Sequence, residues 1–158
     1  MSVKIHLNSE QIHALDLSPV EEKIEDYLEK GRIADYEQKV SFELNYPRDP
    51  SDPRELSEIP EIRLWFVRLD ARYPWFLYLL DGKTGELYRY IAMLVPHQFN
   101  RAEGIQYNPE ALEIFAMKKI FVLHDWLKKQ NITSTLKLKA IAQSLGFDLD
   151  DTLFNLLG

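Results

Sequence analysis

The sequence predicts an α+β protein in which an antiparallel sheet of about four to five strands packs against helices, with a helical C-terminal third. Three observations support this prediction. Apolar and polar residues alternate near the N-terminus and again at 40–46, which is the period of a half-buried strand. Three strand-length apolar segments follow between residues 61 and 95. Beyond residue 108, apolar residues recur at helical spacing. A chain of 158 residues without an evident linker is expected to form one domain, 1–158.

The N-terminal third is expected to hold two strands and one helix. Pro19 suits the first turn of a helix and Gly31 suits its left-handed end. Pro47 ends the second strand, because proline lacks a donor for the ladder. The expected elements are a strand at 3–7, an ambiguous stretch at 8–17, a helix at 19–30, a strand at 40–46 and a proline-rich acidic loop at 47–60.

The central third is expected to add three strands. Tyr73-Pro74 separates the first from the second, and Asp81-Gly82 is typical of a hairpin connection between the second and third. All three are apolar on both faces, so they need cover on both sides, either from helices of this chain or in part from a partner. The expected strands are Glu61–Asp70, Trp75–Leu80 and Glu86–Val95.

The C-terminal third is expected to be helical. Asn108-Pro109 begins a long helix that runs to about Gln130, and two shorter helices cover 134–145 and 150–157. The last two resemble a helix-turn-helix, but three aspartates at the start of the second would repel DNA phosphates. We therefore interpret them as a structural hairpin.

Composition excludes several classes of function. The chain contains no cysteine, so it forms no disulfide and offers no thiolate nucleophile or iron–sulfur ligand. Its net charge of −6 disfavours nucleic acid as a partner. The apolar runs are too short to insert into a membrane, and residues 1–17 lack the apolar core of a signal peptide. These features predict a cytoplasmic protein.

No catalytic or metal-binding motif stands out. None of the four histidines has the spacing of a helical zinc site, and there is no nucleophile elbow. The segment Asp81–Gly85 lacks the spacing of a phosphate-binding loop, and Asp70 is interpreted as an ion pair or turn cap in preference to a general acid or base. We therefore predict no cofactor, no metal, no catalytic residue and no enzymatic activity.

Arginine and aromatic residues concentrate in the central segment. Arg, Trp and Tyr are the residue types enriched at binding hot spots. This concentration predicts a partner-binding surface. Its expected members are Arg68, Arg72, Tyr73, Trp75, Tyr88, Arg89, Tyr90 and His97.

Longer strings in the same region resemble a known family. They are RLWFVRLDARYPW at 63–75, GELYRY at 85–90, AMLVPHQ at 92–98 and NPEALEIF at 108–115. These strings resemble the chlororespiratory-reduction assembly factors of cyanobacteria and chloroplasts. More narrowly, they are similar to the factors that mature iron–sulfur subunit I of the photosynthetic NAD(P)H dehydrogenase-like complex. The resemblance implies a cytoplasmic or stromal assembly factor that binds the immature iron–sulfur subunit, and it carries no catalytic residues over. Two alternatives stay open: a small-molecule enzyme of unrecognised class, and a structural subunit of a complex.

Overall fold

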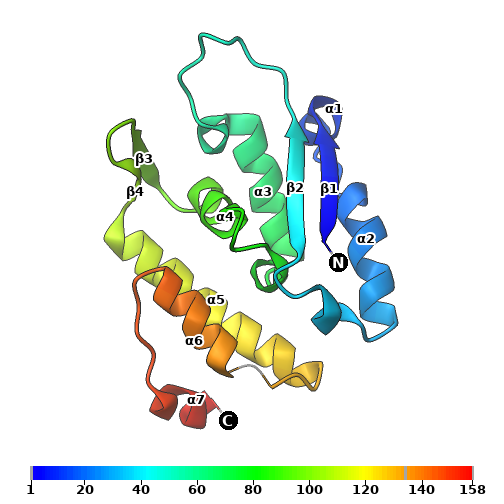
Figure 1. The fold of residues 1–158 in the computed structure, drawn as a ribbon, viewed down its shortest axis with the longest axis vertical. Helices are drawn as coiled ribbons and strands as arrows, with labels where there is room; N and C mark the ends of the chain where they lie inside the picture. Colours follow the sequence, from blue (N-terminus) through cyan, green and yellow to red (C-terminus); the bar gives the residue numbers. More distant parts are fainter. Residues whose placement is uncertain (1, 134, 158) are drawn as a thin grey trace.

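The computed structural model describes residues 2–133 and 135–157 and shows a mixed α/β architecture (Figure 1). The prediction of the α+β class with a helical C-terminal third is confirmed. In order, the elements are β1 (Val3–Asn8), α1 (Ser9–His13), α2 (Ser18–Glu29), η1 (Ile33–Tyr36), β2 (Val40–Asn45), η2 (Leu56–Glu58), α3 (Pro60–Arg72), η3 (Phe76–Leu79), α4 (Glu86–Leu94), β3 (His97–Asn100), β4 (Gly104–Tyr107), α5 (Pro109–Lys129), α6 (Thr135–Ser144) and α7 (Asp151–Leu157), where η marks a short 3-10 helix.

The first sheet is a two-stranded parallel ribbon of β1 and β2. Val3 pairs with Val40, and the register continues to Asn8 opposite Asn45. The pairing is parallel because α1 and α2 carry the chain back to the starting end of β1 before β2 begins. Only one face is buried, and α3 lies against it: the Phe42 ring meets those of Trp65 and Phe66 at 5.9 and 5.2 Å between centroids. The expected strands at 3–7 and 40–46 are present, but not in one antiparallel sheet.

Helix α3 replaces the strand expected at Glu61–Asp70, and that expectation is wrong. Pro60 occupies the first turn, where its missing N–H costs nothing. Four residues at helical spacing form the inward face, and one of them, Trp65, is completely buried. Its indole Nε1 donates a hydrogen bond of 3.0 Å to the Asp16 carbonyl. The inward residues are Ile62, Trp65, Phe66 and Leu69.

The expected strands Trp75–Leu80 and Glu86–Val95 are also helical, so the predicted hairpin is wrong. The first is η3, and only Leu80 keeps a β-bridge, to Val40. The second is α4, which starts after Gly85 in the left-handed conformation, with φ of 76°. Glycine suits this position because a Cβ disfavours positive φ.

The antiparallel pairing in the described residues is the short hairpin of β3 and β4, with His97 opposite Tyr107. Each of the two sheets has two strands, instead of one sheet of four to five. The three C-terminal helices lie within a residue or two of the predicted boundaries, although the predicted first residue of α6, Ser134, lies outside the described residues. None of the described helices is long and apolar enough to cross a membrane.

Candidate partner-binding surface

The eight residues predicted to bind a partner do not share one surface. The structure divides them by exposure, because the segments that carry them are helices and not strands. Tyr73, Trp75 and Tyr90 are buried and His97 is half-buried. The remaining members are exposed, and they are Arg68, Arg72, Tyr88 and Arg89.

The buried members have packing roles in place of the expected partner contact. Trp75 is 8% exposed and stacks on Trp126 of α5, with ring centroids 4.7 Å apart and planes inclined by 11°. The Tyr90 hydroxyl donates a 2.6 Å hydrogen bond to Asp70 Oδ1. Tyr73 Oη is buried without a hydrogen-bond partner among the described residues, and burial raises the pKa of Tyr73. These three side chains are not accessible to a partner in this conformation.

His97 joins β3 to the loop before α3. Its Nδ1 lies 3.0 Å from the Val95 carbonyl oxygen, which can only accept, so Nδ1 carries the proton. In the neutral ring, Nε2 then accepts from the Ser57 hydroxyl at 3.1 Å. Arg63 holds the same residue by donating from Nε and Nη2 to the Ser57 carbonyl at 3.2 and 3.1 Å. Ser57 is buried, so this Ser–His pair acts as a structural clamp.

Two of the exposed arginines are neutralised within the chain. Arg72 pairs with Glu21 of α2 at 2.6 Å and with Glu25 at 3.8 Å. Arg89 donates to Glu86 at 2.9 Å. Burial raises the pKa of Glu86, although Arg89 and the Phe42 backbone N–H act in the opposite direction.

The outward face of α3 is the feature that sequence reasoning missed. Leu64 is 54% exposed and Val67 is 46% exposed, and Pro60 and Ala71 are exposed beside them. These four residues follow the spacing i, i+4, i+7 and i+11, which places them in one row directly opposite the buried face. We call this row the α3 ridge. Its signal was present in the sequence, but it cannot be separated from a strand that is apolar on both faces.

A shallow groove runs beside the α3 ridge. It has a volume of about 260 Å³ and is lined by Glu58, Pro60, Arg63, Leu64 and Val67. Arg68 lies on the other flank and has no ion-pair partner within the part of the chain that the structure describes. The ridge is therefore an apolar surface with an arginine on each side.

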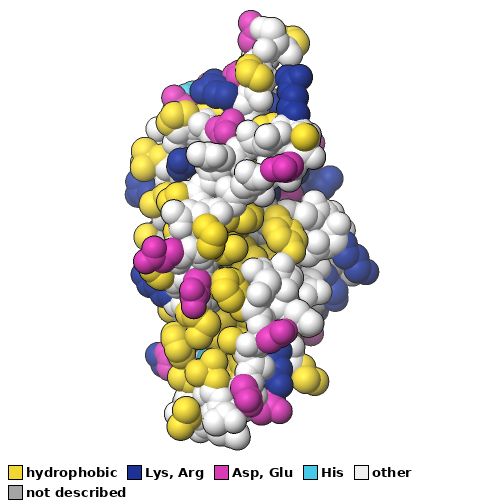
Figure 2. All heavy atoms as spheres, turned by 90° about the vertical axis from the view of Figure 1, so that its left-hand side faces the viewer, with side chains coloured by type: hydrophobic (Ala, Val, Ile, Leu, Met, Phe, Trp, Pro, Cys, Tyr) yellow, Lys and Arg dark blue, Asp and Glu magenta, His cyan; other side chains and the backbone are white. Residues whose placement is uncertain are grey.

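A second apolar face lies on the C-terminal side. Figure 2 shows hydrophobic side chains gathered through the middle and lower part of the face formed by the β3–β4 hairpin, α5 and the C-terminal segment, with acidic side chains beside them. On α5, Ile114 and Phe121 are seven residues apart and both exposed. Monomeric proteins rarely expose large contiguous apolar patches without a binding role.

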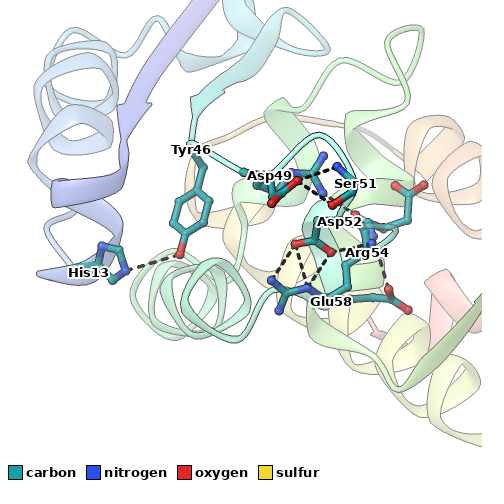
Figure 3. A network of polar contacts seen from close by, with 9 residues as sticks. His13, Tyr46, Asp49, Ser51, Asp52, Arg54 and Glu58 are labelled. Atoms are coloured by element: carbon teal, nitrogen blue, oxygen red, sulfur yellow. Dashed lines mark hydrogen bonds and ion pairs between the residues drawn. The ribbon is translucent and has the colours of Figure 1, made fainter.

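The loop between β2 and α3 is held by local polar contacts (Figure 3). Asp49 accepts from the N–H and hydroxyl of Ser51, and Arg54 binds Asp52 through two nitrogens. The hydrogen bonds from Arg54 lower the pKa of Asp52 to about 2. At the start of the loop, the Tyr46 hydroxyl lies 3.4 Å from His13 Nε2. These acidic residues support the loop's own conformation.

The two buried lysines are also occupied by structural contacts. Lys119 Nζ lies 2.5 Å from Asp70 Oδ1, the oxygen that also accepts from Tyr90. Lys137 Nζ lies 2.6 Å from Glu37 Oε1 and donates to the Tyr78 carbonyl at 3.0 Å. Burial lowers the pKa of Lys137 to about 8. The described residues include no group of three or more His, Asp or Glu side chains placed to hold a metal ion.

Comparison with known proteins places this sequence in a family. No solved structure matches the chain. The model of the family described as chlororespiratory reduction 6 matches residues 7–156. This match takes in both the α3 ridge and the C-terminal apolar face, and it covers nearly the whole sequence. The chain belongs to the chlororespiratory reduction 6 family.

Proposed function

We propose that this protein is an assembly factor that binds an immature iron–sulfur subunit of the photosynthetic NAD(P)H dehydrogenase-like complex. Membership of the chlororespiratory reduction 6 family implies a role in assembly of this complex. The single observation that carries a protein-binding role is the apolar surface that the chain leaves uncovered on α3 and on the C-terminal face. We place this activity in the cytoplasm, or in the stroma of a plastid.

The mechanism we propose is temporary cover of apolar surface. Before its clusters are inserted and before it docks, an iron–sulfur subunit exposes surface that will later be buried. An apolar face on the assembly factor covers such surface and leaves when cluster insertion or docking replaces it. The chain contains no cysteine, so the clusters stay with the cysteine thiolates of the subunit.

The polar contacts of the predicted residues sharpen the proposal. Arg72 and Arg89 have carboxylate partners on this chain, so a partner must compete for them. Tyr88 is exposed, and its hydroxyl donates to the Ser144 carbonyl. Arg68 has no ion pair with any described residue to break. Of the predicted partner-binding residues, Arg68 is therefore the one we expect to contribute most.

A capture experiment tests the proposed function. Purified wild-type protein is immobilised and offered the cluster-free iron–sulfur subunit or the mature complex in separate assays. We expect retention of the cluster-free subunit and little retention of the complex. Stoichiometric co-purification with the mature complex would identify a structural subunit instead. Equal failure to retain either form would reject the proposal.

A further inference from the structure

The α3 ridge has the dimensions and chemistry of a helix-docking surface. We propose that it binds an acidic amphipathic helix of the partner, one whose apolar row is flanked by Asp or Glu. This inference rests on the proposed function and names the kind of segment that the iron–sulfur subunit would present. It differs from a general apolar cover because it fixes both the shape and the charge of the occupant.

The shape follows from the spacing of the ridge. Pro60 and Ala71 are eleven residues apart, which corresponds to about 16 Å along a helix. An apolar row of this length on a helix packs into the groove between the side-chain rows of another helix. Leu64 and Val67 stand at its centre and are the most exposed large apolar side chains of α3. Three turns of a partner helix would cover them.

The charge follows from the arginines that border the ridge. At 100° per residue, Arg63 and Arg68 fall on opposite sides of the row. Arg63 donates to a neutral carbonyl, so its charge is not compensated there. Arg101 lines the adjoining groove, and Glu58 is common to both grooves. Arginine binds carboxylate through two parallel hydrogen bonds, which favours Asp and Glu on the occupant.

The acidic residues nearby contact neutral groups, as Arg63 does. The Glu58 carboxylate accepts from the Glu55 N–H at 3.3 Å. Burial raises the pKa of Tyr46, and the negative charge of Glu61 adds to this effect. Arg68 is the charged group beside the ridge whose side chain has no ion-pair partner among the described residues. The positive charge of the arginines beside the ridge is opposite in sign to the net charge of −6 of the chain. An acidic occupant would therefore be guided to this face.

A second copy of this chain does not offer such a surface on its most acidic helix. Its acidic helix is α2, which carries Glu21, Glu22 and Glu25. The apolar residues of α2, Val20 and Ile24, are fully buried in the core. A second copy could present the acidic side of α2 but not its apolar row. Because α5 exposes Ile114 and Phe121, the experiment also tests self-association; the occupant we propose is a different protein.

The experiment uses two variants of the ridge and two matched controls. Leu64→Asp places a charge in the apolar row, and Arg68→Glu reverses the charge at one side of that row. Both positions are exposed, so melting temperatures should stay near wild type. Ala34→Asp, at an exposed position in η1, controls for a charge placed on an exposed apolar residue away from both apolar faces. Lys83→Glu, in the exposed turn before α4, controls for reversal of charge.

Two measurements separate this inference from the proposed function. In capture of the cluster-free subunit, we expect Leu64→Asp and Arg68→Glu to weaken binding about tenfold or more, with the controls near wild type. Normal capture by both folded ridge variants would overturn the inference and leave the proposed function intact. Absence of capture by wild type would reject the proposed function, and the second measurement would then judge the ridge alone.

The second measurement uses a designed helical peptide with a leucine row flanked by glutamates, and the same peptide with lysines in their place. Fluorescence anisotropy should show binding of the glutamate peptide to wild type, and at least about tenfold weaker binding to Leu64→Asp. The lysine peptide should bind about tenfold more weakly than the glutamate peptide. Preference for the lysine peptide would contradict the inference. Concentration-dependent self-association that Leu64→Asp abolishes would do the same, because it would make a second copy the occupant.

Discussion

Lys119 and Lys137 show how single side chains connect distant parts of this chain. Both lie on C-terminal helices, and each reaches a carboxylate from an earlier part of the chain, Asp70 on α3 or Glu37 after η1. The two lysine side chains are only 5% and 8% exposed. A buried ion pair adds little net stability, but removal of one partner leaves a buried charge that costs several kcal/mol. These pairs therefore favour one arrangement of the helices over others.

Lys137 makes stability depend on pH in a specific window. Burial lowers its pKa from 10.5 to about 8. Between these values the unfolded chain binds more protons than the folded chain, so the free energy of unfolding should rise with pH. We expect a rise on the order of 1–2 kcal/mol between about pH 7 and 9.5. Urea denaturation at each pH measures it.

The variant Lys137→Met provides the control for this prediction. It removes the titrating group and keeps an unbranched side chain of similar length. Glu37, 38% exposed, keeps its contact with the Tyr78 hydroxyl. Burial raises the pKa of Tyr78, so tyrosine ionisation in the unfolded chain opposes the trend above about pH 10. Parallel pH profiles for wild type and Lys137→Met would show that Lys137 does not titrate in this window.

At the scale of elements, the stack of Trp75 on Trp126 joins η3 to α5. Trp75 was predicted to contact a partner, and the structure gives it a core position. We expect Trp75→Ala to lower the free energy of unfolding by about 3–5 kcal/mol, the usual cost of deleting a buried large aromatic. Denaturant melts measure this, with Trp75→Phe as the milder substitution.

The same variant separates packing from recognition. Under conditions where Trp75→Ala is still folded, it should capture the cluster-free subunit as wild type does. If the folded variant loses capture while Leu64→Asp keeps it, then η3 moves during binding and exposes Trp75. That result would favour the segment around Trp75 as the partner-binding surface and contradict docking on the α3 ridge.

Elements whose apolar residues follow one clear spacing could be predicted from the sequence. Elements whose apolar residues fit both a helix and a strand could not. In β1 and α2, one face is apolar and the other polar, so the period agrees with the structure and the predicted boundaries lie within one residue. In α3, Leu64 and Val67 fill the outward face, so the segment is apolar at both odd and even positions. That pattern fits a strand buried on both sides as well as a helix. Pro60 at its start was the signal that could have decided between them.

The binding surface shows the same ambiguity. Residue type alone indicated the arginines and aromatics of the central segment as a binding surface. These residues lie on helices, which distribute them around an axis, whereas strands would have placed them on the two faces of one sheet. Arg68 and Tyr90 therefore differ completely in exposure. The apolar residues that made the α3 segment fit a strand are the residues that form the α3 ridge. The wrong prediction of a strand and the candidate binding surface have the same cause. Both arise from apolar side chains on the outward face of α3, where folding alone does not need them.

At the scale of the whole molecule, one continuous core joins the parallel ribbon to the C-terminal helices. It runs from Ile5 on β1 to Phe154 on α7. The Asp70–Lys119 contact links α3 to α5 across 49 residues of sequence, and Glu37–Lys137 links η1 to α6. A structure tied in this way should unfold as a unit. We therefore predict a single domain with one cooperative transition.

The three tryptophans allow this prediction to be tested from two ends of the molecule. A variant with Trp75→Phe and Trp126→Phe keeps Trp65, which reports on α3 against the ribbon. A variant with Trp65→Phe and Trp75→Phe keeps Trp126, which reports on α5. Each is unfolded in urea and followed by its own fluorescence and by far-UV circular dichroism. Within each variant the two midpoints should coincide, because loss of either part exposes the shared core. If Trp126 fluorescence changes at a lower urea concentration than the circular dichroism, the C-terminal helices form a separate unit, and the buried lysine contacts do not couple the two parts.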